Sequence, residues 1–221
     1  MVSTLTTSRQ CQRCGKATRS SLSLSEGLCS VCRVQREREQ GSSKANAAIR
    51  SLLERDDVLI LDTETNGAGK GAEVIEVSVI NTKGETLLDT LVKPKISTMN
   101  PWAQKVHGIS LGMLKDAPSW PDVFPELATI ADRRTILAWN APFDAWMLGQ
   151  TSTTWEVEHP KWLFVCAMRL YAKKRAIKNR GLHKAVGDEG LTHLFEQYAS
   201  HRALGDVVFV LEVLRATSRA S

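Results

Sequence analysis

Two carboxylates that could bind a metal ion follow directly after a run of four apolar residues, Val58-Leu-Ile-Leu61. The composition of this run is typical of a buried central strand. Because side chains alternate along a strand, Asp62 and Glu64 should project from one face at its carboxyl end, where open α/β sheets bind ligands. Paired carboxylate oxygens are the ligands that hard divalent cations prefer. Acidic residues that only cap a strand in solvent are the alternative.

Two later segments place further polar groups at expected element ends. Asp144 closes Asn140-Ala-Pro-Phe-Asp144, and Asp206 closes His201-Arg-Ala-Leu-Gly-Asp206. Four carboxylates converging on one sheet edge would suit two Mg2+ or Mn2+ ions, which assist in-line phosphoryl displacement. On a continuous helix, His201 and Asp206 would point about 140° apart. They can meet only if His201 lies in the preceding loop, where its imidazole could act as a general base.

Four of the five cysteines form two C-x2-C pairs, Cys11-Gln-Arg-Cys14 and Cys29-Ser-Val-Cys32. This spacing is typical of a tetrahedral structural Zn2+ site. A disulfide framework is the less favoured alternative, because the sequence has no recognisable secretion signal. Cys166, which sits among apolar residues, is expected in the core.

The composition of the 221 residues, 43% hydrophobic and 24% charged, is that of an ordinary soluble protein. No apolar run reaches the roughly 18 residues needed to cross a bilayer, so we expect a cytoplasmic protein without a membrane segment. The net charge of +5 is uneven, because residues 1–55 carry 10 basic and 4 acidic residues. A basic appendage favours a polyanionic partner such as nucleic acid, although a merely solvated basic tail is the alternative.

The apolar patterns predict a zinc-ribbon-like module over residues 1–40, a linker over 41–55 with a flexible joint at Gly41-Ser42-Ser43, and a catalytic domain over 56–221. In that domain a hairpin, turning at Asn81-Thr-Lys-Gly84, precedes alternating strands and helices. This order predicts an α/β domain with a mixed five-stranded sheet flanked by helices. The expected elements are strands near 58–61, 72–80, 85–92, 135–139 and 161–165, and helices near 102–107, 122–131, 142 onward, 167–175, 191–199 and 203–216.

The three acidic segments resemble, in order, the exonuclease motifs of the DEDD 3′→5′ exonucleases, in the histidine-bearing DnaQ-like (DEDDh) branch. Val106-His-Gly-Ile109 resembles a further segment of that family, and the likeness covers residues 56–217. It implies a ribonuclease H-like fold, two Mg2+ or Mn2+ ions, and release of nucleoside 5′-monophosphates from a 3′ end. By matching positions, the metal ligands would be Asp62, Glu64, Asp144 and Asp206, and His201 would be the general base. The residues holding the terminal nucleotide would be Thr65, Asn66, Gly67, His107, Gly108, Ile109, Asn140 and Phe143.

The resemblance leaves the substrate open. We expect DNA, with RNA or short oligonucleotides as the runner-up, and a non-catalytic nucleic-acid-binding adaptor as the rival of a different class. Departures at Trp139 and Asn66, where relatives often carry His and Thr, concern substrate preference. The zinc module, outside the family domain, could bind nucleic acid or dock a polymerase or other replication or repair protein.

Two other features could contact nucleic acid. A basic run extends through Arg169, Lys173, Lys174, Arg175, Lys178, Arg180 and Lys184, and its middle is expected to be a loop. This loop could guide a phosphate backbone, or it could simply be solvated. Trp102 and Trp120 lie in expected Pro-containing loops and could stack on bases, although tryptophans are more often core residues.

Overall fold

A five-stranded mixed sheet forms the centre of the computed structural model, which describes residues 10–17 and 26–219. The strand order is β3-β2-β1-β4-β5. The strands are β1 (Val58–Thr65), β2 (Val74–Asn81), β3 (Thr86–Leu91), β4 (Thr135–Ala138) and β5 (Leu163–Cys166). β1, β2 and β3 are antiparallel neighbours, whereas β4 pairs in parallel with both β1 and β5. The predicted fold class is confirmed.

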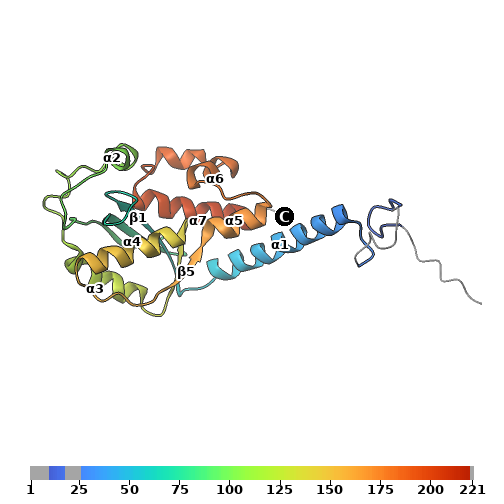
Figure 1. Ribbon diagram of the computed structural model, residues 1–221, viewed down its shortest axis with the longest axis horizontal. Helices are drawn as coiled ribbons and strands as arrows, with labels where there is room; N and C mark the ends of the chain where they lie inside the picture. The colour runs from blue at the N-terminus through green and yellow to red at the C-terminus, as the bar shows by residue number, and fades with distance from the viewer. Residues whose placement is uncertain (1–9, 18–25, 220–221) are drawn as a thin grey trace, which may run out of the picture.

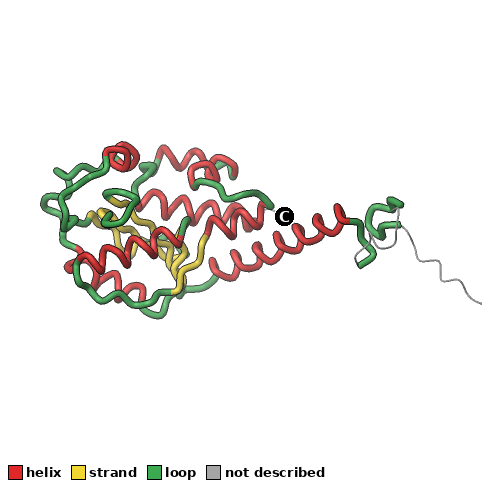
Figure 2. The backbone as a smooth tube through the Cα atoms, viewed as in Figure 1, coloured by secondary structure: helices red, strands yellow, loops and turns green. Residues whose placement is uncertain are grey.

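Helices cover both faces of the sheet (Figure 1), with the strands enclosed between them (Figure 2). On one face lie α3 (Trp120–Ala131) and α4 (Ala141–Thr154). On the other lie α1 (Ser30–Leu53), α5 (Ala167–Arg175), α6 (Leu182–Asp188) and α7 (Ala203–Arg219). Strand β1 contributes side chains to the apolar core on both faces of the sheet. Val58 and Ile60 pack on the face covered by α7, whereas Leu59 and Leu61 pack on the opposite face. By the same alternation, Asp62 and Glu64 face α7.

Local chemistry explains several element ends. In the β2–β3 turn, the Asn81 side-chain oxygen accepts from the N–H groups of Lys83 and Glu85, and Gly84 has a positive φ of 96°. The short helix α2 (Pro101–His107) begins at Asn100, whose side chain accepts two backbone N–H groups, and ends at Gly108 in the left-handed region. These features agree with the predicted hairpin and with the predicted short helix.

The expected flexible joint at residues 41–43 is wrong. Helix α1 runs without interruption from Ser30 to Leu53 and projects beyond the main body, carrying the cysteine pairs at its far end (Figure 1). Contacts with the main body stabilise α1 at residues 41–43 and beyond. Ser42 Oγ donates to the carbonyl oxygen of Lys174 in α5, and Ile49 is fully buried. Tertiary contacts therefore outweigh the poor helix propensity of Gly41.

The predicted helix over 191–199 is also wrong. A 3-10 helix, η2 (Thr192–Glu196), occupies part of this segment. The middle of the basic run, residues 176–181, is the loop that was expected, and α6, which was not expected, follows it. Beyond η2, the Ala199 carbonyl oxygen packs closely against Gly205 of α7. A Cβ placed on Gly205 would lie 2.3 Å from that oxygen. Among the described residues, no helix has the length and apolar character that crossing a membrane requires.

Candidate active site

The four predicted acidic residues meet at one edge of the sheet. Asp62 and Glu64 project from the end of β1, and Asp206 lies in the first turn of α7. One carboxylate oxygen from each of these three lies within 4.8 Å of the others. Asp144, in the first turn of α4, accepts a hydrogen bond of 3.0 Å from Thr63 Oγ1. Asp62, Glu64, Asp144 and Asp206 line one cavity of about 200 Å3.

Burial and mutual repulsion make these carboxylates difficult to ionise together. Desolvation, followed by the charges of Asp144, Asp206 and Glu64, raises the pKa of Asp62 well above its usual value. Desolvation and the neighbouring carboxylates raise the pKa of Glu64 to about 9. Desolvation raises the pKa of Asp144 to about 7, against the opposing hydrogen bond from Thr63. Such a set of oxygen donors, buried at Asp144 and Asp206 and half-buried at Asp62 and Glu64, fits hard divalent cations, which would relieve the repulsion.

His201 lies in the turn before α7, which meets the condition set by its spacing from Asp206. Its backbone has a φ of 56°, in the left-handed region that non-glycine residues seldom adopt. This conformation directs its N–H to Asp206 Oδ1 at 3.3 Å, and its side chain lines the carboxylate cavity. Desolvation and the nearby His183 lower the pKa of the imidazole, so its neutral form prevails at neutral pH.

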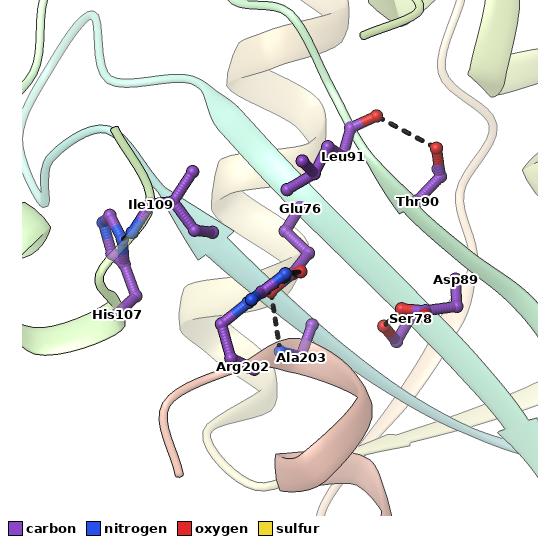
Figure 3. A network of polar contacts seen from close by, with 9 residues as sticks. All are labelled: Glu76, Ser78, Asp89, Thr90, Leu91, His107, Ile109, Arg202 and Ala203. Carbon is purple, nitrogen blue, oxygen red and sulfur yellow. Dashed lines mark hydrogen bonds and ion pairs between the residues drawn. The ribbon is translucent and has the colours of Figure 1, made fainter. Parts of the chain in front are cut away.

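A partly buried ion pair that the sequence did not reveal holds this turn in place (Figure 3). Glu76 on β2 accepts from Arg202 Nε at 2.9 and 3.1 Å, and its second oxygen accepts from the Ala203 backbone N–H at 2.9 Å. Glu76 therefore caps α7 and clamps the residue next to His201. Glu76 lies opposite Glu64 in the pairing of β1 with β2. The positive charge of Arg202 therefore offsets the negative charge of Glu76 beside the site. The sequence signal that could have indicated this ion pair is the charged Glu76 inside the apolar run Val74-Ile-Glu-Val77.

His183 is a second residue that the sequence reasoning missed. It comes from α6, and its Nε2 lies 3.0 Å from Asp206 Oδ1. Its ring meets the His201 ring edge to face, with centroids 4.1 Å apart. No helix or strand was predicted for the segment containing His183, and no local pattern linked this residue to the acidic set.

A second cavity, of about 180 Å3, adjoins Glu64 between α2 and the end of β1. Of the residues expected to hold a nucleotide, Thr65, Gly67, His107 and Phe143 line it. Trp102 is 72% exposed and lines the same cavity, so its face is open to a base. The other candidate for stacking, Trp120, is fully buried, and that expectation is wrong. Its indole fills the core and donates to Ser152 Oγ.

The remaining nucleotide candidates lie differently. Asn140 lines the carboxylate cavity. The side chain of Asn66 hydrogen-bonds the backbone of Glu73 in its own loop and of Thr98 in the loop before α2. Gly108 ends α2, and Ile109 is fully buried in a small apolar cluster. These last three therefore shape the loops around the second cavity without lining it.

At the far end of α1, the four sulfur atoms of Cys11, Cys14, Cys29 and Cys32 lie within 4.8 Å of one another. Cys14 Sγ and Cys29 Sγ are 3.9 Å apart, too far for a disulfide. Sulfurs placed tetrahedrally at about 2.3 Å from zinc would be about 3.8 Å apart. The Cys29 backbone N–H donates to Cys11 Sγ, and this contact leads the causes that lower the pKa of Cys11 to about 6. The cluster fits a zinc module.

The basic residues around this cluster are largely paired. Arg13 forms a two-pronged ion pair with Glu39, at 2.7 and 2.9 Å. Arg36 pairs with Glu26, and Arg33 lies 3.9 Å from Glu37. Arg9 and Arg19, which also belong to the basic appendage, lie outside the described residues. These acidic partners are already included in the charge count, so the pairs occupy Arg13, Arg33 and Arg36 but leave the net charge of residues 1–55 unchanged.

The mixed sheet, with its buried carboxylates at one edge, defines the class of ribonuclease H-like nucleases. The model of the exonuclease family (RNase T) matches residues 59–214, and the chain belongs to this family. The uncharacterized exonuclease CP81 of Escherichia phage 186 is 30% identical over 174 residues, covering 74% of this chain and 89% of that protein. This result confirms the resemblance drawn from the motifs.

Two further proteins extend the comparison. A DNA polymerase III of PolC type from Caldanaerobacter subterraneus subsp. tengcongensis is 32% identical over 92 residues, which is 40% of this chain and 6% of the polymerase. The nuclease domain of 3′hExo, a DEDDh family member bound to rAMP, has a TM-score of 0.61 at 16% identity. The likeness covers 74% of this chain and 92% of that domain, and it shows the shared fold.

Proposed function

We propose that this exonuclease removes nucleotides one at a time from the 3′ end of DNA, releasing nucleoside 5′-monophosphates. The convergence of Asp62, Glu64, Asp144 and Asp206 with His201 around one cavity carries the proposal. A protein that only bound nucleic acid would gain nothing from keeping mutually repelling carboxylates buried together. This reasoning disfavours the adaptor alternative.

In the proposed mechanism, the four carboxylates would hold two Mg2+ or Mn2+ ions. The bound ions would supply charge stabilisation for the phosphate and for the attacking and leaving oxygens. His201, with its lowered pKa, would accept the proton of the attacking water. Glu76 and Arg202 would act as positioning residues, because they hold the turn from which the imidazole projects. Trp102 and Phe143 would flank the terminal base beside Glu64.

The choice of DNA rests on the likeness to a DNA polymerase, whereas the structural neighbour bound to rAMP keeps RNA as the alternative. The test uses matched DNA and RNA oligonucleotides labelled at the 5′ or the 3′ end, with and without Mg2+. We expect 5′-labelled DNA to shorten progressively and 3′-labelled DNA to release labelled mononucleotide at once. Faster shortening of RNA would assign the exoribonuclease role. Binding without any cleavage would assign the adaptor role.

Metal binding should release protons at neutral pH. Without metal, burial and the neighbouring carboxylates raise the pKa of Glu64 to about 9, so this carboxyl holds its proton at pH 7, and they also raise the pKa of Asp62. A dication displaces them, so its apparent affinity should rise with pH by about tenfold per unit for each proton released. Calorimetry in buffers of different ionisation enthalpy measures this release. A heat that does not depend on the buffer, with a flat affinity between pH 6 and 8, would contradict the raised pKa values.

We also propose that Cys11, Cys14, Cys29 and Cys32 bind one structural Zn2+. Elemental analysis of the purified protein should find one equivalent of zinc. The Cys14→Ser/Cys29→Ser double variant should lose it, because two of four ligands are removed. The Cys166→Ser variant is the matched control, since Cys166 lies in β5 and donates to the Trp139 carbonyl. Zinc retained by the double variant would refute the assignment.

The continuous α1 suggests how the module serves the enzyme. A helix of 24 residues is about 36 Å long, and its second half is anchored to the core by Ile49 and by Arg50, which donates to the Ser218 carbonyl. The module would thus contact nucleic acid or a partner such as a polymerase at a set distance from the catalytic domain. This geometry replaces the flexible tether expected from the sequence.

A further inference from the structure

A second group of metal-ligating atoms shares Asp206 with the carboxylate set. His183, His201 and Asp206 each offer one nitrogen or oxygen, and these atoms all lie within 4.8 Å of one another. They come from three different places, namely α6, the turn before α7, and α7 itself. Tertiary packing therefore completes this histidine set, because it brings His183 to the local pair His201 and Asp206.

The ligand chemistry of the histidine set differs from that of the catalytic carboxylates. Two imidazole nitrogens and one carboxylate suit transition-metal dications such as Zn2+, whereas Mg2+ prefers oxygen ligands only. His183 is also held in place, because its ring meets the edges or faces of Phe195 and Phe209 at centroid distances of 5.7 Å. Its side chain is 25% exposed, so an ion can reach it from solvent. Preorganised ligands lose little freedom when they bind a metal.

We propose that His183, His201 and Asp206 form a Zn2+ site that inhibits the enzyme when it is filled. The ion would replace the hydrogen bond between His183 and Asp206 and would occupy the lone pair of His201. A coordinated imidazole nitrogen cannot accept a proton, and one Asp206 oxygen would be diverted from the carboxylate set. The inhibition rests on the proposed function, in which His201 is the base, whereas the binding of zinc does not.

Binding is tested with Co2+, whose visible absorption reports its ligands. The protein carries Asp62→Asn, which disables the carboxylate site but leaves the histidine set unchanged, and its cysteines are first filled with one equivalent of zinc. Cobalt binds such sites more weakly than zinc, so it should not displace the zinc. We expect one further equivalent of Co2+ to bind. Its visible absorption should be that of four- or five-coordinate Co2+, without the thiolate-to-metal charge-transfer bands of a cysteine site.

Two variants in the same background separate the histidine set from surface binding. His183→Gln keeps a nitrogen near Asp206 but removes an imidazole ligand, and it should weaken cobalt binding by about tenfold or more. His193→Gln, which changes an exposed histidine of η2, should leave the affinity unchanged. Two outcomes would overturn the proposal. One is that Co2+ binds with equal affinity to Asp62→Asn alone and to both double variants, and the other is that Asp62→Asn binds no Co2+ beyond its one equivalent of zinc.

Inhibition is measured separately in protein with an intact carboxylate set. At saturating Mg2+, added Zn2+ should reduce cleavage. With the inhibition of each protein expressed relative to its own uninhibited rate, His183→Gln should raise the half-inhibitory zinc concentration about tenfold above that of the wild type. His193→Gln should not change this concentration. If cobalt binds as expected but zinc does not inhibit, the site stands and the role of His201 as base fails. If zinc inhibits wild type and His183→Gln equally, the inhibitory site lies elsewhere and the proposal fails.

Discussion

Replacing Asp62 with asparagine should abolish metal-dependent cleavage while raising the melting temperature of the metal-free protein. Asparagine has nearly the same shape but carries no charge, so the ligand is lost without opening a cavity. We expect cleavage to fall by at least about 10³-fold, because the residue would contact the ions that stabilise the transition state. Single-turnover cleavage of a labelled oligonucleotide measures this loss.

The gain in stability follows from the raised pKa of Asp62. A carboxyl whose folded-state pKa exceeds its unfolded value favours folding at low pH, and this contribution is lost as the pH rises through the folded pKa. At pH 7 the variant should therefore be the more stable protein, and near pH 3 the difference should vanish. Each kcal/mol relieved corresponds to about 2–4 °C in a chain of this size. A lower melting temperature at pH 7 would contradict the raised pKa of Asp62.

Asp116→Asn is the matched control for both measurements. Asp116 is exposed in the loop after α2 and lies outside the cavity residues. The Asp116→Asn variant should retain the wild-type cleavage rate and the wild-type melting temperature. A second readout separates metal binding from folding, because Mg2+ should raise the melting temperature of the wild type and of Asp116→Asn but not that of Asp62→Asn.

Replacing His201 with asparagine should lower the cleavage rate by about 10²- to 10⁴-fold, the usual contribution of a general base. Asparagine is chosen because it tolerates the left-handed backbone that His201 adopts, with a φ of 56°. The four carboxylates are unchanged, so Mg2+ binding should persist. Rapid-quench kinetics together with calorimetric metal titration distinguish lost proton transfer from lost metal.

The pH profile gives a second readout for His201. The active form of a base is the deprotonated one, and desolvation together with His183 lowers the pKa of this imidazole. At saturating Mg2+, the wild-type rate should therefore fall toward acid pH only below about 6.5, the usual histidine value. This limb should disappear in His201→Asn. A variant with the wild-type rate and the same limb would assign the proton transfer to another group.

Much of the acidic site could be predicted because its features are local. Alternation along a strand placed Asp62 and Glu64 on one face, and the run of apolar residues before them identified the buried strand. The spacing of His201 and Asp206 required a loop before the last helix, and the structure has that loop. The hairpin at Asn81–Gly84 and the cap of α2 at Gly108 likewise follow from side chains within a few residues. In each case neighbours along the chain carry the physical cause.

Only the tertiary structure decided how the remaining groups meet. Gly41-Ser42-Ser43 has the composition of a joint, yet contacts with α5 keep α1 continuous there. Glu76 and Arg202 are 126 residues apart, and His183 and Asp206 are 23 apart on different helices.

The sequence by itself therefore determined the chemistry of the site and the order of its motifs, because strand period, turn residues and ligand types act over short distances. The fold decided that Glu76 would clamp the turn carrying His201 and that His183 would reach Asp206. Such contacts depend on how helices pack across a sheet, and packing selects partners by shape and burial, which no spacing along the chain encodes.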